Sequence, residues 1–405
     1  MKSNKIHAHA SAQNNADGEF INQAEAEHEN YRICRISGVE IRVWGAENGK
    51  GLARELLSAL RPVIRRIESC LPISLMADHH PAEAGVVGSV IVSARYAVPD
   101  LIGADCGCGV YAALTGMSLG RDSSETLRAI HRSIVEQVPV GRAQNGSVSP
   151  HILDMAVWKK LEQVPFISKH DIRRLQHQLG SLGGGNHFIE LASDGEGRIW
   201  LLIHSGSRYL GGLLRERFKG KALLLGSDEA AEFFEVQRAV MEFARLSREE
   251  MARRVLLCLK NCNSDSDFVV LEEIDLAHNF VENSTDSSVA VHRKGACAAA
   301  EHQRGIVPGS MGSYSYVVEG RGNPASYSSS SHGAGRRFSR GDAFRKLSSR
   351  QLFEDMQGIV WDQSEKLKDE SPRAYKNIEG VMRAQSDLVR ICHRLEPILS
   401  VKGLK

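Results

Sequence analysis

The feature that most constrains the fold is a long apolar stretch over residues 86–114. Valine, isoleucine, leucine and alanine dominate it, and it is broken at Pro99, Gly103, Gly107 and Gly109. Near-continuous apolar runs are typical of strands buried on both faces. Glycines inside such runs mark bends or close approaches of the backbone. We therefore expect two buried strands joined by a tight, glycine-shaped loop.

Strand and helix patterns alternate along the rest of the chain. An amphipathic pattern or a helix-favouring composition predicts helices at 49–70, 121–137, 168–179 and 342–395, and two more within 211–260. Strands are expected at 31–45, 198–204, 287–293 and 313–319, and the C-terminal tail is strand-like. Interleaved signals favour one mixed α+β unit with central β-sheets and peripheral helices. We expect a flexible leader over 1–25 and one large domain over 26–405.

Composition limits the class of protein. The 405 residues are 42% hydrophobic and 25% charged, which is ordinary for a globular domain. The net charge of +2 gives no global basic field, so any nucleic acid must bind a local patch. No apolar run reaches the ~18 residues that span a bilayer, and no signal-peptide core precedes residue 20. We expect a cytoplasmic monomer without membrane contact, whose eight cysteines are not joined in a disulfide framework.

Three short motifs combine metal-binding side chains with glycines. Asp105 and Cys108 lie three residues apart in a glycine-bent loop, where a hard carboxylate and a soft thiolate suit Mn, Zn, Co or Fe better than Mg. His187 follows three glycines at 183–185, and His204 ends a buried strand. Taken singly, each motif also fits a tight turn or a hydrogen-bonded structural histidine.

Two further motifs add basic residues. His278 precedes a compact basic cluster at 292–294 (His-Arg-Lys), which suits phosphate. His332 lies in a Gly/Ser loop ahead of Arg336 and Arg337. A neutral imidazole can attack phosphorus, and neighbouring arginines would stabilise the developing charge. The alternatives are a solvated basic turn and an ordinary Gly/Ser surface loop.

Considered together, these residues fit one site better than five unrelated turns. Three histidines, one carboxylate and one thiolate would hold two transition-metal ions if the thiolate bridges them. Two metals beside a phosphate-seeking histidine imply phosphoryl or nucleotidyl transfer.

Nine motifs in order make the chain resemble the RtcB family of RNA-splicing and RNA-repair ligases. They extend from about residue 75 to 403. They are DCGCG at 105–109, GGGNHFIE at 183–190, HSGSR at 204–208, HN at 278–279, HRKGA at 292–296, PGSMG at 308–312, HGAGR at 332–336, AYK at 374–376 and VKG at 401–403.

The resemblance implies a GTP-dependent ligase that joins RNA 3′-phosphate or 2′,3′-cyclic phosphate ends to 5′-hydroxyl ends. A histidine takes GMP from GTP, passes it to the RNA 3′-phosphate, and the 5′-hydroxyl then displaces GMP. His332 would be guanylylated. Two Mn²⁺ ions would be held by Asp105, Cys108, His187, His204 and His278, with Cys108 bridging. A helper protein is a further candidate partner.

The resemblance also implies a nucleotide pocket. Glu190, Ser310, Ser315 and Lys402 would face the guanine edge, and Tyr375 would stack on the base. The complete expected set is Asn186, His187, Phe188, Glu190, His278, Asn279, Pro308, Gly309, Ser310, Met311, Ser315, His332, Gly333, Ala334, Gly335, Tyr375 and Lys402. Candidates for RNA phosphate contacts are Arg208, His292, Arg293, Arg336 and Arg337.

The chain departs from the family pattern in three places. Residues 76–88 read MADHHPAEAGVVG, Cys106 replaces an aliphatic residue, and the helical stretch at 211–260 is distinctive. These differences leave the substrate open between transfer RNA splicing and repair of another cleaved RNA. The competing functions are a two-metal phosphodiesterase or phosphatase on the same scaffold and a non-catalytic protein that binds RNA ends. The presence of His332, Tyr375 and Lys402 argues against the first, and the retention of the nucleophile and of every ligand argues against the second.

Overall fold

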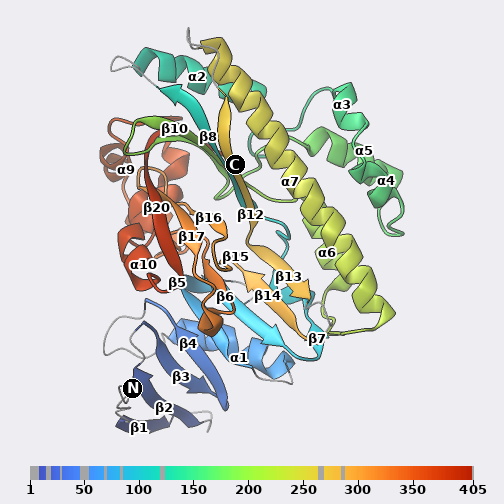
Figure 1. Cartoon of the computed structure of the whole chain (residues 1–405), viewed down its shortest axis with the longest axis vertical. Helices are drawn as coiled ribbons and strands as arrows, with labels where there is room; N and C mark the ends of the chain where they lie inside the picture. The colour runs from blue at the N-terminus through green and yellow to red at the C-terminus, as the bar shows by residue number, and fades with distance from the viewer. Residues whose placement is uncertain are drawn as a thin grey trace.

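The computed structural model describes residues 9–14, 20–27, 30–45, 54–67, 71–82, 85–118, 124–262, 269–283 and 288–403, with side chains from residue 30 onward. Two large sheets and the helices around them form a mixed α+β fold, as the sequence predicts (Figure 1). Within the described residues, no helix is both long and apolar enough to cross a membrane.

The first sheet contains the N-terminal strands and has the order β1-β2-β3-β4-β5-β6-β14-β13. Helix α1 (Arg54–Arg66) packs on it through Leu56 and Leu60, two of the leucines that predict its apolar face. The strands of this sheet are β1 (His9–Asn14), β2 (Phe20–Glu27), β3 (Arg32–Ile36), β4 (Val39–Val43), β5 (Ile73–Ala82), β6 (Gly85–Ser93), β13 (Asn279–Asn283) and β14 (Ala290–Lys294).

The second sheet has the order β12-β8-β10-β9-β20-β17-β16, and β19 (Val360–Trp361) pairs with β20. Helices α2 (Ser124–Gln137) and α7 (Asp228–Cys262) cover one face, where Ile130 and Met251 pack against Leu201. Figure 1 shows α7 running diagonally along this side of the molecule. The other strands are β8 (Gly109–Ser118), β9 (Phe188–Ser193), β10 (Arg198–Ser205), β12 (Val270–Ala277), β16 (Arg304–Val307), β17 (Ser315–Gly320) and β20 (Val389–Lys402).

The apolar stretch 86–114 forms the two expected strands, and they belong to different sheets. Strand β6 lies in the first sheet and β8 in the second, so the glycine-rich segment between them crosses from one sheet to the other. Strand β8 is buried on both faces: Tyr111 and Ala113 face the α2–α7 core, whereas Ala112 and Leu114 face the opposite cluster. The loop that carries Asp105 and Cys108 therefore lies where the sheets meet.

Smaller elements complete the chain. Alongside α7 are α3 (Pro150–Leu153), α4 (Val157–Glu162), α5 (Lys169–Gln178) and α6 (Tyr209–Phe218), so the two helices expected within 211–260 are present. Short strands are β7 (Tyr96–Ala97), β11 (Leu223–Leu224), β15 (Ala296–Ala298) and β18 (Ser329–Ser331). The remaining helical segments are η1 (Pro99–Leu101), η2 (Pro324–Ser326), α8 (Arg340–Lys346), α9 (Ser349–Asp355), η3 (Glu365–Glu370), η4 (Pro372–Ala374) and α10 (Ile378–Ala384).

One expectation differs from the structure, and another stays a prediction. Helix was predicted through residue 395, but β20 already begins at Val389 and pairs with both β9 and β17. Sheet pairing has thus overridden the local helical pattern. A flexible leader was predicted over 1–25, but β1 and part of β2 lie there; the rest of that segment is outside the described residues. The proposed division into leader and single domain stays a prediction.

Candidate active site

A cleft of about 420 Å³ opens where the two sheets meet. Its walls come from loops that are distant in sequence: the β7–β8 connection, the start of β9, the ends of β10 and β12, the β16–β17 turn and the segment after β18. Most of the residues expected at the site line this one cleft. Among them are Asp105, Cys108, Asn186, Phe188, His204, His278, Asn279, Pro308, Gly309, Ser310, His332, Gly333, Ala334, Gly335, Tyr375 and Lys402.

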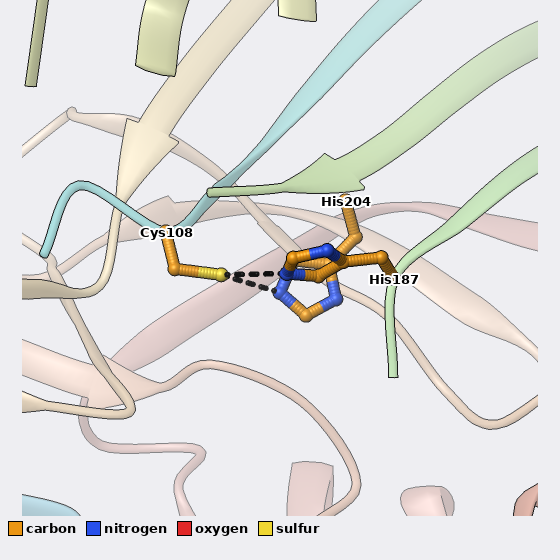
Figure 2. Close-up of side chains that lie close together, drawn as sticks. All are labelled: Cys108, His187 and His204. Carbon is orange, nitrogen blue, oxygen red and sulfur yellow. Dashed lines mark hydrogen bonds between the residues drawn. The ribbon is translucent and has the colours of Figure 1, made fainter. Parts of the chain in front are cut away.

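A buried group of one thiol and two imidazoles forms the floor of the cleft (Figure 2). The Sγ of Cys108 lies 3.2 Å from Nε2 of His204 and 3.6 Å from Nε2 of His187. His187 donates from Nδ1 to the Leu182 carbonyl at 3.0 Å, so its Nε2 is left unprotonated for a metal. Tetrahedral metal bonds of about 2.1–2.3 Å would separate such ligands by about 3.4–3.8 Å. The group is therefore a metal-binding site in both chemistry and spacing.

Two more expected ligands flank this group. The Oδ2 of Asp105 lies 3.3 Å from Nε2 of His187, and Nε2 of His278 lies 3.4 Å from Nε2 of His204. Gly206 makes room for the carboxylate, because a Cβ there would lie 2.0 Å from Oδ1 of Asp105. All five predicted ligands are therefore brought together, with Cys108 and His204 in the middle of the set.

Burial controls the charge of these ligands in the metal-free protein. It raises the pKa of the Cys108 thiol well above its ordinary value, and the nearby Asp105 charge adds to that rise. It also lowers the pKa of His204 and of His278, helped by neighbouring imidazoles. The two histidines are thus held neutral, which is the form that binds metals.

Arg248 on α7 supports the ligand loops from behind, and the sequence gives no sign of this role. Its Nη1 donates to the carbonyls of Gly107 at 3.0 Å and Ser205 at 2.9 Å, the neighbours of Cys108 and His204. Its side chain is 1% exposed and is paired with Asp275. One buried guanidinium therefore fixes the relative position of two ligand-bearing loops.

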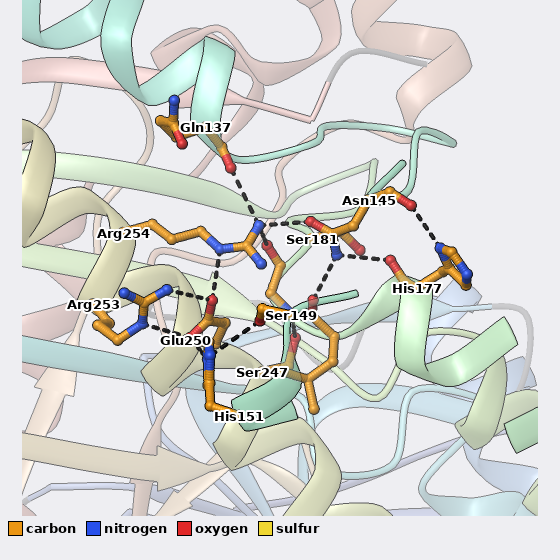
Figure 3. A network of polar contacts seen from close by, with 12 residues as sticks. Gln137, Asn145, Ser149, His151, His177, Ser181, Ser247, Glu250, Arg253 and Arg254 are labelled. Atoms are coloured by element: carbon orange, nitrogen blue, oxygen red, sulfur yellow. Dashed lines mark hydrogen bonds and ion pairs between the residues drawn. The ribbon is translucent and has the colours of Figure 1, made fainter. Parts of the chain in front are cut away.

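The glycine loop before His187 is held by a polar network on the side facing α7 (Figure 3). Ser247 of α7 accepts a hydrogen bond from the Gly180 amide at 3.0 Å. Arg254 donates to Glu250 at 2.8 Å and to Asn145 at 2.6 Å. Asn145 in turn donates to the Leu179 carbonyl at 2.8 Å. This network fixes the start of the loop, so the His187 position depends on α7 as well.

His332 enters the cleft beside the metal ligands, with its ring centre 4.8 Å from that of His278. Its Nδ1 lies 2.6 Å from Oδ2 of Asp78, a fully buried carboxylate on β5. Burial opposes ionisation of Asp78, but the interaction with His332 and the Lys376 charge lower its pKa overall. The sequence analysis assigned Asp78 no role; the available signal was a carboxylate inside an apolar strand.

Lys402 and Tyr375 line the far end of the cleft, and a buried chain of charged and polar groups lies behind them. Lys402 Nζ lies 3.1 Å from Oε2 of Glu370, and the Tyr375 hydroxyl donates to the same oxygen at 2.6 Å. Ser315 donates to Oε1 of Glu190 at 3.2 Å. Burial raises the pKa of Glu190 to about 8, against the Ser315 hydrogen bond and the Lys402 charge. Glu370 is a member of the site that the sequence analysis missed.

Several expected residues have structural contacts that limit their roles. Asn279 donates to the Asp105 carbonyl at 3.2 Å and accepts from the Gly295 amide at 2.8 Å, so it braces the loop. The Met311 side chain packs in an apolar cluster with Leu352 and Trp361 rather than in the cleft. Only its backbone is available to a nucleotide.

The structure corrects two of the candidates for RNA phosphate contacts. Both ring nitrogens of His292 are used inside the fold: Nε2 accepts from the Val98 amide, and Nδ1 is bonded to the Ile91 carbonyl. Arg293 is 4% exposed and bonded to Ser329 and Glu282. Neither is free for phosphate. Instead, Lys294 and Arg215 line the cleft, together with the expected Arg336.

The buried thiol and imidazole set, opening into a cleft of a mixed α+β fold, places the chain among metal-binding enzymes. A family model described as "tRNA-splicing ligase RtcB" matches residues 64–403. The "RNA-splicing ligase RtcB" of Escherichia coli K12 is 30% identical over 413 residues, covering 92% of this chain and all of the relative. The chain belongs to the RtcB family.

Two archaeal relatives with lower identity are also similar over most of this chain. The "tRNA-splicing ligase RtcB" of Nanoarchaeum equitans is 27% identical over 418 residues, and that of Thermococcus kodakarensis is 26% identical over 420. Each alignment covers 81% of this chain and 87% of the relative. The family match over residues 64–403 includes strands of both sheets and every motif of the cleft.

Proposed function

We propose that this protein joins an RNA 3′-phosphate or 2′,3′-cyclic phosphate to a 5′-hydroxyl, using GTP, two Mn²⁺ ions and a guanylylated His332. That it is an RNA ligase follows from its family. The end chemistry, the nucleotide, the metal and the residue roles are the proposal. A cytoplasmic monomer acting in tRNA splicing or RNA repair, with or without a helper protein, completes it.

The observation that carries the proposal is the contact between His332 and Asp78. An ionised carboxylate can only accept a hydrogen bond, so Nδ1 at 2.6 Å must carry the proton. The other ring nitrogen, Nε2, then keeps its lone pair and can act as a nucleophile in the cleft. The Asp78 charge would stabilise the imidazole as it becomes positive during attack.

The ligand set suits two divalent ions of intermediate softness. Asp105, Cys108 and His187 would hold one, and Cys108, His204 and His278 the other, with the thiolate shared. When bound, such ions would neutralise phosphate charge and orient the reacting oxygen atoms. Mn²⁺ accepts the mixed carboxylate, imidazole and thiolate set more readily than Mg²⁺ does.

Three displacements account for the reaction. Nε2 of His332 attacks the α-phosphorus of GTP; a P–N bond forms, and the P–O bond to pyrophosphate breaks. An RNA 3′-phosphate oxygen then attacks the same phosphorus, and the P–N bond breaks, returning the lone pair to His332. Finally the 5′-hydroxyl attacks the RNA phosphorus, losing its proton, and GMP leaves. A cyclic phosphate would first be opened by water.

Recognition of guanine is assigned to the far end of the cleft. Glu190 would accept from the guanine N1–H and amine, Ser315 would contact the same edge, and Lys402 would donate to O6 and N7. Tyr375 would stack on the base. Two observations support this assignment. Ser315 is hydrogen-bonded to Glu190, so the two side chains lie on one edge. The ion pair with Glu370 holds the Lys402 ammonium in place near them. The backbone at 308–311 and 333–335, with Asn186 and Asn279, would meet ribose and phosphates.

The decisive experiment is covalent labelling. The protein is incubated with Mn²⁺ and α-labelled GTP, denatured, and analysed for retained label. We expect labelled wild type, released pyrophosphate and an unlabelled His332→Ala variant. Wild type without label, or equal label on His332→Ala, would refute the role of this histidine. Phosphate release from RNA that survives His332→Ala would favour a phosphatase instead.

A further inference from the structure

A second cavity of about 390 Å³ adjoins the catalytic cleft. Helix α8 and the segment η3 form its walls, and the backbones of Gly185 and Gly403 form part of its floor. Arg340 lines both this cavity and the catalytic cleft, so the two are neighbours across one guanidinium. A Cβ at Gly185 would meet Nη2 of Arg340 at 3.4 Å, so the glycine leaves room at this boundary.

An exposed aromatic ring faces this cavity. Phe344 lies four residues after Arg340 on α8, hence on the same side of the helix, and is 44% exposed. Single exposed apolar residues are common on proteins. This one differs because it lines a cavity and has the Lys368 ammonium 5.0 Å from its ring centre. A flat apolar surface beside a cation suits a planar, anionic ligand.

The charge on the walls also favours an anion. Neither Lys366 nor Lys368 is ion-paired with a carboxylate among the described residues. The two acidic groups of the wall are already bonded: Arg340 lies 2.8 Å from Asp369 and 2.6 Å from Glu370. Glu370 is shared with Lys402 as well. Among the described residues, Lys366 is the cation of the wall that remains available, and Lys368 lies beside the cavity at the Phe344 ring.

We infer that the cavity at Phe344 binds a nucleobase of the RNA strand whose 3′-phosphate end occupies the catalytic cleft. The base stacks on Phe344, and Lys366 and Lys368 contact the flanking phosphates. Aromatic platforms beside cationic side chains are the usual means of binding single-stranded nucleic acid. The inference rests on the proposed function, because that function places the RNA end on the other side of Arg340. This continuity favours RNA over an acidic segment of a partner protein.

The first test compares variants in binding and in guanylylation. Affinity for a fluorescent single-stranded RNA with a 3′-phosphate is measured by anisotropy, with Mn²⁺ and without GTP. Phe344→Ala should weaken binding about five- to 100-fold, whereas Phe344→Trp should retain it. Phe353→Ala is the matched control, because Phe353 is also exposed, at 39%, but packs on Trp361 outside this cavity. All three variants should be labelled by GTP as wild type is.

The second test locates the base. A series of RNAs, each with one abasic nucleotide near the 3′ end, is titrated against wild type and Phe344→Ala. One abasic position should weaken binding to wild type and have no effect on Phe344→Ala, because the stacking partner is already absent.

Two results would overturn the inference, and a third bears on the proposed function. Unchanged affinity of Phe344→Ala for RNA would overturn it and leave the cavity to a protein partner. The same abasic profile for wild type and variant would overturn it too. Absence of GTP labelling on wild type would instead refute the proposed function, and the binding measurements would still report on Phe344 independently.

Discussion

Arg248 and Asp275 form a bidentate ion pair behind the proposed metal ligands, with Nε–Oδ2 and Nη2–Oδ1 distances of 2.7 and 2.6 Å. The remaining guanidinium nitrogen is bonded to the carbonyls next to Cys108 and His204. The long helix α7 is therefore joined directly to two ligand loops. Removing this arginine leaves a partly buried carboxylate and two carbonyls without their donor.

Arg248→Met should lower the free energy of unfolding by about 3 kcal/mol, because it breaks a buried ion pair on one side. Affinity for Mn²⁺ should fall by about 10- to 100-fold, as expected when the support of metal ligands is lost. Urea unfolding and metal titration measure the two effects. Arg245→Met, also on α7 but in an exposed pair with Glu249, should change stability by less than about 1 kcal/mol. Equal effects of both variants would contradict the role of Arg248.

Asp78→Asn should reduce guanylylation by at least about 100-fold while leaving the fold and the bound metal unchanged. Oδ2 of Asp78 accepts from both the backbone N–H of His332, at 3.1 Å, and its Nδ1, so an asparagine would place its amide oxygen there and keep the tautomer. What is lost is the negative charge that stabilises the imidazole as it becomes positive during attack. Rapid-quench labelling with α-labelled GTP gives the rate, and metal analysis provides the control. A normal rate in Asp78→Asn would show that the charge of the carboxylate does not assist the attack.

Much of the site could be predicted because its chemistry is local in sequence. Short local motifs and the family resemblance pointed to Asp105, Cys108, His187, His204 and His278, and the structure brings all five together. What could not be predicted is which basic residues face the cleft. His292 and Arg293 suggested a phosphate-binding cluster, yet β14 lies between β6 and β13 in the sheet and both side chains are buried, one on each face.

The supporting residues were missed for a physical reason. Arg248 donates hydrogen bonds to Gly107 and Ser205, and Glu370 accepts them from Lys402 and Arg336. Each of these partners is more than 30 residues away along the chain. Nothing in their neighbours along the chain distinguishes them from the many solvated charges of a helix. Long-range pairing also explains the error over 389–395, where partners in β17 rather than local propensity determine the strand.

Cys108→Ala should abolish ligation and metal binding, whereas Cys106→Ala should keep most activity. The Sγ of Cys108 lies within the ligand group, but Cys106 packs in an apolar core that includes Ile102 and Leu210. Losing one buried sulfur there should cost about 1 kcal/mol of stability. Metal content, ligation rate and melting temperature are measured for both variants. Equal loss of metal from the two would place the wrong thiol at the site.

Guanine binding should become tighter as the pH rises. Glu190 has a pKa of about 8 in the nucleotide-free protein because it is buried, so near neutral pH it is mostly protonated. Only the carboxylate can accept from both guanine donors, so each pH unit below 8 should weaken binding by up to about tenfold, with a plateau above. The raised pKa also affects the free energy of unfolding: the unfolded chain loses the Glu190 proton from about pH 4.5, before the folded protein does. The folded protein therefore becomes less stable between about pH 4.5 and 8, and bound guanine should offset that loss. Calorimetry with guanosine avoids titrating phosphates and metal ligands, and Glu190→Gln should bind weakly at every pH. A wild-type affinity that does not change with pH would remove Glu190 from the guanine edge.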